Sequence, residues 1–530
     1  MVGRLVRWWQ QLGRLRQLAV LAGVALTLLR LSFIGTGTMA FVDERRYITA
    51  MLGLRALGEG HGRDFLQAIN SLGARPGDGL WRVLPGLGQA FLLIFFKLNP
   101  NAPPSLEVPQ AFNVFILGLN ALLLYKVYRL FLPLGFALLG VALYSSLVNT
   151  NVYLRHILPY DHALFFFLLA LWLLLSQTKR FASRRQWLVG GLAGFSYALY
   201  PGYFMGPLVL LALGWLLATY SKQQTAQTTQ LARLKPVAAH FTGLATVLVL
   251  FEGLARLSGT SYLASSRYIA TTITQGSFAE GFSFTGAYFW RVEGGVGVGL
   301  LVLAGLGLGL SVGQVRGLFA RRGAGLSGRP LAAGLLLLVF GAWLGYAVAV
   351  QFGQKLVFYG RIVHFFVPFI VLSAVVALRY AVELWQPVRV IIMWGSVIVA
   401  IGHFGAFSLA YRAVRYPGDV AYAQGINDAR QIESIETTGC GRGLINYRVF
   451  GPRLRNQPTA GQPRYQLVNF AYLYPLRCYR APRLRAGRLV ASVPYFMKYT
   501  PYQFEGHDAK ERLMLQNQPY VFQIFAVDSK

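Results

Sequence analysis

Long apolar runs recur along most of the first 410 residues of this chain. A helix needs about 20 apolar residues to cross a bilayer. Charged residues make up 13% of the chain, against about 25% in an ordinary soluble domain, and the mean hydropathy is +0.47. We therefore predict an all-α polytopic membrane protein with about eleven spans. The predicted spans are residues 18–37, 108–128, 133–149, 161–175, 187–200, 205–219, 237–257, 295–311, 331–350, 362–378 and 390–410.

Basic residues outnumber acidic ones, with 50 Lys and Arg against 19 Asp and Glu. Many of the cations lie in short loops and at the ends of apolar runs, where they set topology and meet anionic lipid. The net charge of +31 is therefore no signal for nucleic acid. The arginines between Arg4 and Arg16 precede the first apolar run, which predicts an uncleaved anchor and a cytoplasmic N-terminus.

Two domains follow from this topology: a transmembrane module of residues 1–410 and a tail of residues 411–530. The tail falls on the extracytoplasmic side and mixes helical and extended patterns, which predicts a small α/β domain. We expect a helix over residues 419–435 and strands over 467–473 and 520–527. Cys440 and Cys478 both lie in the tail; they are either a disulfide in an oxidising compartment or two free buried thiols. The sequence lacks an Asn-x-Ser/Thr sequon, which favours a bacterial plasma membrane.

Two long outer loops interrupt the spans, over residues 38–107 and 258–294. In the first, residues 48–78 read as an amphipathic surface helix with a glycine-rich turn. Residues 83–98 form a short apolar run broken by proline and glycine. We predict that this run lies in the outer interface, because counting it as a span would place the downstream basic clusters outside.

An acidic pair, Asp43 and Glu44, follows the first apolar run. Carboxylates at a membrane exit are candidates for proton chemistry on a substrate held at the interface. The alternative is that both are solvated charges paired with Arg45 and Arg46. Arg30 and Glu252 lie near the ends of spans, from which a side chain can reach the interface, so we assign them no role.

A second acidic position, Asp161, opens the fourth span on the same side, flanked by Arg155, His156 and His162. Asp161 is a candidate site carboxylate or a helix N-cap. The cations Lys355, Arg361 and Arg291, with His364, belong to later outer loops or helix ends. These cations could neutralise a phosphate. Alternatively, Lys355 and Arg361 could extend to the interface. No metal-binding motif is evident.

The segments Asp43-Glu44-Arg45-Arg46-Tyr47 and Pro159-Tyr160-Asp161-His162, together with the helix from Arg361 to Pro368, resemble the GT-C superfamily of membrane glycosyltransferases. The similarity is to its protein mannosyltransferase (family 39) and lipid A aminoarabinose transferase branch. Ile362 stands where that branch usually has Tyr after the arginine. The resemblance covers roughly residues 18–378.

The resemblance implies inverting transfer of a sugar from a polyprenyl-phosphate donor to an extracytoplasmic glycan, lipid or protein, with no metal or other cofactor strictly required. Asp43 would be the general base, Glu44 its neighbour, and Asp161 a second acid. Donor phosphate would bind Arg361, Lys355 and Arg291. The residues expected to shape the acceptor or substrate site are Tyr47, Arg155, His156, His162 and His364. The alternatives are a transporter or flippase of lipid-linked sugars, which requires broken helices and polar groups at the bilayer midplane, and a non-catalytic scaffold.

Overall fold

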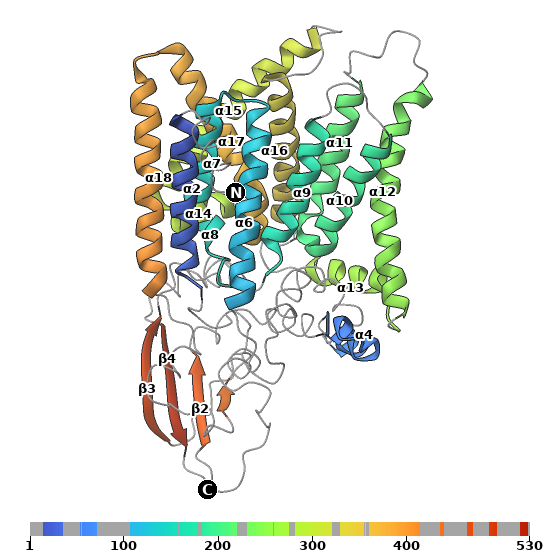
Figure 1. Ribbon diagram of the computed structural model, residues 1–530, viewed down its shortest axis with the longest axis vertical. Coiled ribbons are helices and arrows are strands. Elements are labelled where there is room, and N and C mark those ends of the chain that lie inside the picture. Colours follow the sequence, from blue (N-terminus) through green and yellow to red (C-terminus); the bar gives the residue numbers. More distant parts are fainter. Residues whose placement is uncertain are drawn as a thin grey trace, which may run out of the picture.

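A computed structural model describes residues 14–34, 53–54, 56–71, 107–156, 158–176, 183–219, 230–257, 259–274, 281–320, 329–353, 356, 360–413, 435–438, 464–469, 487–495 and 520–527. Helices form a bundle, and strands follow near the C-terminus (Figure 1). The first helices are α2 (Arg14–Leu31), α4 (Gly62–Ser71), α6 (Glu107–Arg129), α7 (Leu134–Ser146), α8 (Val148–Asn151), α9 (Tyr160–Leu175), α10 (Ser183–Leu199), η1 (Pro201–Tyr203) and α11 (Met205–Thr219). The later ones are α12 (Gln230–Leu257), α13 (Tyr262–Thr274), α14 (Gly281–Val292), α15 (Gly294–Ala320), α16 (Arg329–Gln351), α17 (Gly360–Leu384) and α18 (Val388–Ala413).

A helix occupies each of the eleven ranges predicted to span the membrane. Seven segments of the described chain are long and apolar enough to cross a bilayer, and they lie in α6, η1–α11, α12, α15, α16, α17 and α18. Shorter apolar helices occur in α2, α7 and α9. The prediction of an all-α polytopic membrane bundle is therefore confirmed for this part of the chain.

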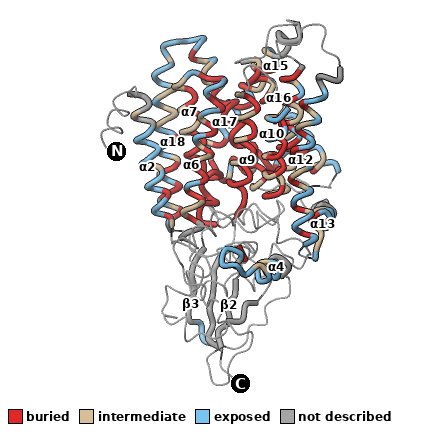
Figure 2. The backbone as a smooth tube through the Cα atoms, turned by 45° about the vertical axis from the view of Figure 1, so that its right-hand side comes forward, coloured by how far each residue is buried: buried red, intermediate tan, exposed pale blue. Residues whose placement is uncertain are grey.

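Helix α17 is the centre of the bundle. Along its apolar window 83% of residues are buried, whereas 17% are buried along α18 at the periphery. Figure 2 shows this contrast as a red core inside a paler rim. The first turn of α17, which carries Gly360, Arg361 and His364, is therefore held by neighbours on several sides.

Residues 258–294, which we predicted as an outer loop, contain α13 and α14. Helix α14 buries Phe284, Tyr288 and Phe289 against the core. These aromatic residues form the apolar face of a helix. Glu252 accepts a hydrogen bond from the Leu263 backbone N–H at 2.9 Å, so its carboxylate caps the start of α13.

The amphipathic segment predicted over residues 48–78 contains α4, and the glycine-rich turn before it has Gly60 at a φ of +86°. That left-handed conformation favours glycine. Residues 83–98, expected in the interface, lie outside the described residues.

The described strands of the tail form one sheet in the order β1-β2-β4-β3. They are β1 (Ile435–Thr438), β2 (Arg464–Asn469), β3 (Gly487–Tyr495) and β4 (Tyr520–Val527). β1 pairs with β2 in parallel, and the other pairs are antiparallel. β4 covers the strand predicted over residues 520–527, and β2 overlaps the strand predicted over residues 467–473. Ile435 begins β1, and the rest of the predicted helix 419–435 lies outside the described residues. The sheet lies beyond the end of α18, at the same end of the bundle as α4 and α13 (Figure 1).

Helices α10 and α12 pack backbone to backbone. A Cβ atom added at Gly190 would lie 1.9 Å from the His240 carbonyl oxygen, and one at Gly243 would lie 1.9 Å from that of Trp187. Small residues allow such close approach between membrane helices. Glycine plays the same role at Gly307 of α15, where an added Cβ would meet the Ser373 carbonyl oxygen of α17 at 2.0 Å.

We expect Gly190→Ala to destabilise the protein by about 1–3 kcal/mol, because overpacking forces the two helices apart. Gly305→Ala is the matched control, since a Cβ there meets nothing within 4 Å. Thermal unfolding in detergent should show a lower Tm for Gly190→Ala and an unchanged or higher Tm for Gly305→Ala. Equal Tm values for the two variants would contradict the close packing.

Candidate active site

The chain between α7 and α8 breaks at Leu147, whose φ of −69° and ψ of 143° are those of extended backbone. A helix break leaves carbonyl groups unpaired on one side and N–H groups unpaired on the other. Here the break is buried, and Leu147, Val148 and Asn149 are at most 1% exposed. The orphaned groups therefore need partners from elsewhere in the protein.

Glu293, between α14 and α15, pairs with the N–H groups that begin α8. Its two carboxylate oxygens accept the backbone N–H groups of Val148 at 2.9 Å and Asn149 at 2.7 Å. Glu293 is 2% exposed, and His403 of α18 lies 2.7 Å from the same carboxylate. The anion thus lies at the positive end of the short helix.

Arg30, near the end of α2, pairs with the carbonyl side of the break. Its guanidinium donates to the Ser145 carbonyl oxygen at 2.7 Å and to Asn151 Oδ1 at 2.9 Å. The residue is 4% exposed. The sequence assigned Arg30 no role, and in the structure its guanidinium finds acceptors at the α7–α8 break inside the bundle.

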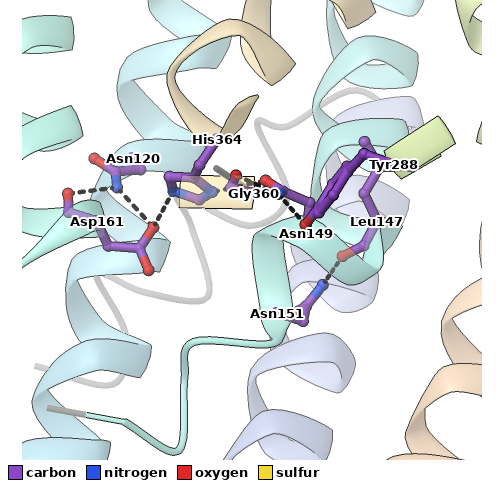
Figure 3. A network of polar contacts seen from close by, with 8 residues as sticks. All are labelled: Asn120, Leu147, Asn149, Asn151, Asp161, Tyr288, Gly360 and His364. Carbon is purple, nitrogen blue, oxygen red and sulfur yellow. Dashed lines mark hydrogen bonds and ion pairs between the residues drawn. The ribbon is translucent and has the colours of Figure 1, made fainter. Parts of the chain in front are cut away.

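From this break a chain of side chains leads to Asp161 (Figure 3). Asn149 Oδ1 lies 2.8 Å from His364 Nδ1, and His364 Nε2 lies 3.3 Å from Asp161 Oδ1. Asn120 of α6 donates its amide to the Asp161 backbone carbonyl at 3.0 Å and to Asp161 Oδ1 at 3.5 Å. Helices α6, α8, α9 and α17 thus meet at one polar cluster, which we name the Asp161 cluster: Asn120, Asn149, Asp161 and His364.

Asp161 is no N-cap in this structure. Helix α9 begins at Tyr160, its N-cap position is Pro159, and no side-chain capping hydrogen bond forms there. The Asp161 side chain instead pairs with His364 inside the bundle, where it is 5% exposed. A buried carboxylate beside an imidazole is a candidate for proton chemistry.

Arg361 lies next to this cluster through the aromatic residues of α9. Its guanidinium donates to Tyr160 Oη at 3.0 Å. The Tyr160 ring in turn packs edge-on against Tyr153 and Tyr200, with ring centroids 4.8 and 4.9 Å apart. Arg361 is half-buried and held by its contact with Tyr160.

The other predicted site residues in the described chain are not members of the Asp161 cluster. Arg155 donates to the Tyr411 carbonyl oxygen at 3.0 Å and lies over the Tyr411 ring, so it joins the loop before α9 to α18. His156 is fully buried, and its backbone carbonyl accepts from Asn113 at 2.6 Å. His162 packs against the Phe112 ring at 5.4 Å between ring centroids. Arg291 is on the last turn of α14.

The remaining predicted site residues lie outside the described residues. These are Asp43, Glu44, Tyr47, Lys355, Cys440 and Cys478. The helix that leads to the acidic pair is described, and Arg30 joins its end to Asn151 of α8. Asn149, which precedes Asn151 by two residues, contacts His364. Across the described ranges, no group of three His, Cys, Asp or Glu side chains could hold a metal ion.

Sequence reasoning missed Asn120, Asn149, Glu293 and His403 as site residues. The run Asn149-Thr150-Asn151 at the end of an apolar span was the available signal, since three consecutive polar residues there need buried partners. Glu293 was visible only as one charge in a loop of mixed composition. Its partners are about 145 residues earlier and 110 later in the chain, so spacing alone does not reveal them.

We expect Glu293→Ala to cost about 3–5 kcal/mol of stability, because removing one partner of a buried charged pair leaves the other groups unpaired. Glu383→Ala is the control, since that carboxylate is 36% exposed in an i,i+4 pair with Arg379, a pair worth about 0.3–0.5 kcal/mol. Unfolding midpoints in detergent compare the two variants. A Glu293→Ala loss no larger than the control's would contradict the role of the carboxylate at the break.

Comparison with known proteins returned no matching family model and no matching curated protein. Among solved structures, the chain is similar to the crystal structure of ArnT from Cupriavidus metallidurans bound to undecaprenyl phosphate. The two are 13% identical, the alignment covers 95% of this chain and 97% of that chain, and the TM-score is 0.49. At this score the likeness carries no argument about function, which has to come from the residues of the site.

Proposed function

We propose that the protein is a membrane glycosyltransferase that moves a sugar from a polyprenyl-phosphate donor to an acceptor on the extracytoplasmic side, with inversion at the sugar carbon. The observation that carries this proposal is the buried Asp161–His364 pair with Arg361 adjoining it through Tyr160. A carboxylate with an imidazole suits proton chemistry, and a guanidinium suits a phosphate leaving group. Asp161 and His364 are 203 positions apart in the chain, and Tyr160 and Arg361 are 201 positions apart.

In the proposed reaction, the acceptor oxygen attacks the anomeric carbon as the bond from that carbon to the donor phosphate breaks. Asp43 takes the proton from the acceptor, and the lipid phosphate leaves as an anion. Arg361 neutralises that anion in the transition state. Lys355 and Arg291 are further proposed partners of the phosphate, and Glu44 supports Asp43. No metal or other cofactor takes part in the proposed steps.

The Arg30 contact supports a common site for Asp43 and Asp161. It fixes the end of α2 against α8, and Asp43 follows that helix end by 12 residues. Since Asn149 of α8 contacts His364, the segment carrying the acidic pair starts beside the Asp161 cluster. Arg412 at the end of α18 adds a second anchor, donating to Ser32 Oγ at 2.6 Å.

A transporter or flippase of lipid-linked sugars is the second candidate, and one feature favours it. Transporters use broken helices with polar groups deep in the membrane, and the α7–α8 break is a broken helix with buried polar partners. His403, the partner of Glu293, lies ten residues before the end of α18 at Ala413, which is about 15 Å along the axis at 1.5 Å per residue. Glu293 and His403 are thus a pair of polar groups inside the bundle that the sequence analysis did not identify.

We expect Asp43→Asn to fold normally and to lower sugar transfer by about 10²–10⁴-fold, the usual contribution of a general base. Asp64→Asn is the control, because Asp64 is a 65% exposed carboxylate in the same outer segment. The assay is radiolabelled sugar transfer from a polyprenyl-phosphate donor in proteoliposomes. Full activity of Asp43→Asn would remove it as the base, while sugar-lipid translocation without transfer in the wild type would favour the transporter.

We expect Arg361→Ala to raise the KM for the donor by about 10–100-fold, since a charged hydrogen bond is worth about 1.5–3 kcal/mol and 1.4 kcal/mol is tenfold. Arg256→Ala is the matched control, because Arg256 is a 70% exposed cation near the end of α12. The measurement is initial rate against donor concentration. An unchanged donor KM in Arg361→Ala would exclude Arg361 from donor binding.

A further inference from the structure

The His364 ring lies between two side-chain oxygens inside the bundle. Asn149 Oδ1 is 2.8 Å from Nδ1, and Asp161 Oδ1 is 3.3 Å from Nε2 (Figure 3). The His364 side chain is fully buried. Water therefore does not compete for either ring nitrogen, and the two oxygens decide where its protons lie.

The orientation of the Asn149 amide is fixed by its other contacts. Its Nδ2 donates to Tyr288 Oη at 2.6 Å and approaches the Gly360 carbonyl oxygen at 3.3 Å. A backbone carbonyl only accepts hydrogen bonds, so the amide nitrogen faces Gly360 and Oδ1 faces His364. The Asn149 backbone N–H donates to the Glu293 carboxylate, which fixes this part of the backbone.

This orientation determines the proton on Nδ1. An amide oxygen only accepts, so Nδ1 carries a hydrogen and donates it to Asn149. A neutral imidazole has one ring proton. A neutral His364 with its proton on Nδ1 would present a lone pair on Nε2 to Asp161 Oδ1, which is also an acceptor. A second proton must therefore lie between these two atoms.

We infer that Asn149 is a positioning residue that holds His364 in its Nδ1–H form and thereby makes the His364–Asp161 pair retain one proton. The pair is then either an imidazolium with a carboxylate or a neutral imidazole with a carboxylic acid. Both forms have a net charge of zero. Without Asn149, a neutral His364 would donate Nε2–H to the Asp161 carboxylate, and the pair would carry a charge of −1.

Resting on the proposed function, the net charge of this pair matters for the donor. Arg361 donates to Tyr160, the residue before Asp161. An uncompensated carboxylate so near would oppose a phosphate bound by Arg361. A pair with no net charge leaves the guanidinium to attract the anion.

Two charged groups near the pair, Arg30 and Glu293, offset one another. Arg30 is near enough to interact electrostatically with Asp161, and it is fixed at the α7–α8 break opposite the Glu293 carboxylate. His403 pairs with Glu293 and not with the cluster. Within the four residues of the Asp161 cluster, the proton between His364 and Asp161 therefore sets the net charge, because Asn120 and Asn149 are neutral.

The test is ¹⁵N NMR of the full protein in detergent micelles at neutral pH with ¹⁵N-labelled histidine. The His364 signal is assigned by its loss in His364→Gln. We expect a protonated Nδ1 in the wild type, with Nε2 either protonated as well or bare. In Asn149→Ala, His364 should carry its proton on Nε2 alone, while Asn149→Asp, which keeps an acceptor oxygen, should retain Nδ1–H.

Asn113→Ala is the control, because Asn113 is another buried amide of α6 and donates to the Leu154 and His156 carbonyl groups in the loop before α9. It should leave the His364 signal unchanged. A wild-type His364 protonated on Nε2 alone would overturn the inference. So would an unshifted signal in Asn149→Ala, or the same shift in Asn113→Ala.

A kinetic measurement addresses the role in donor binding. We expect Asn149→Ala to raise the donor KM by about tenfold with a smaller change in kcat, because the pair regains its negative charge near the phosphate. A loss in kcat alone would contradict this role. Because the NMR measurement needs no transfer activity, it tests Asn149 even if the transferase proposal fails, and Asp43→Asn tests that proposal by itself.

Discussion

The buried break between α7 and α8 is the constraint on which the candidate site depends. A helix that ends inside a bundle leaves carbonyl and N–H groups that water cannot reach. Arg30 pairs with the carbonyl side and Glu293 with the N–H side, so one cation and one anion match the two dipole ends. Because these charges come from α2 and from the α14–α15 junction, the break also joins helices that are far apart in sequence.

The same break supplies the geometry of the Asp161 cluster. Asn149 has its backbone held by Glu293 and its amide held by Tyr288 and Gly360, so its oxygen is presented to His364. Transition-state stabilisation requires groups that are oriented before the substrate arrives. A break fixed by buried charges provides that orientation, and the proposed transferase chemistry would make use of it.

The sequence predicted the helices well and the site partly. Apolar length placed a helix at each expected span, and β4 occupies the strand expected at residues 520–527. Asp161, His364 and Arg361 were named from their position at helix starts, and the structure brings them into one region. The sequence did not reveal that Asp161 pairs with His364 instead of capping α9, nor that the range 258–294 contains helices α13 and α14. In both cases a tertiary partner, and not the local pattern, decided the outcome.

The sequence by itself determined that this chain forms a helical membrane bundle, because a bilayer accepts a long apolar segment only when its backbone hydrogen bonds are satisfied internally. Only the tertiary structure decided which polar residues meet. Hydrogen bonds span a few ångströms in space, whereas Arg30 and Asn151 are 121 residues apart and His364 and Asp161 are 203 apart. No periodicity encodes such pairs. They follow from how the helices pack, and in particular from the break between α7 and α8.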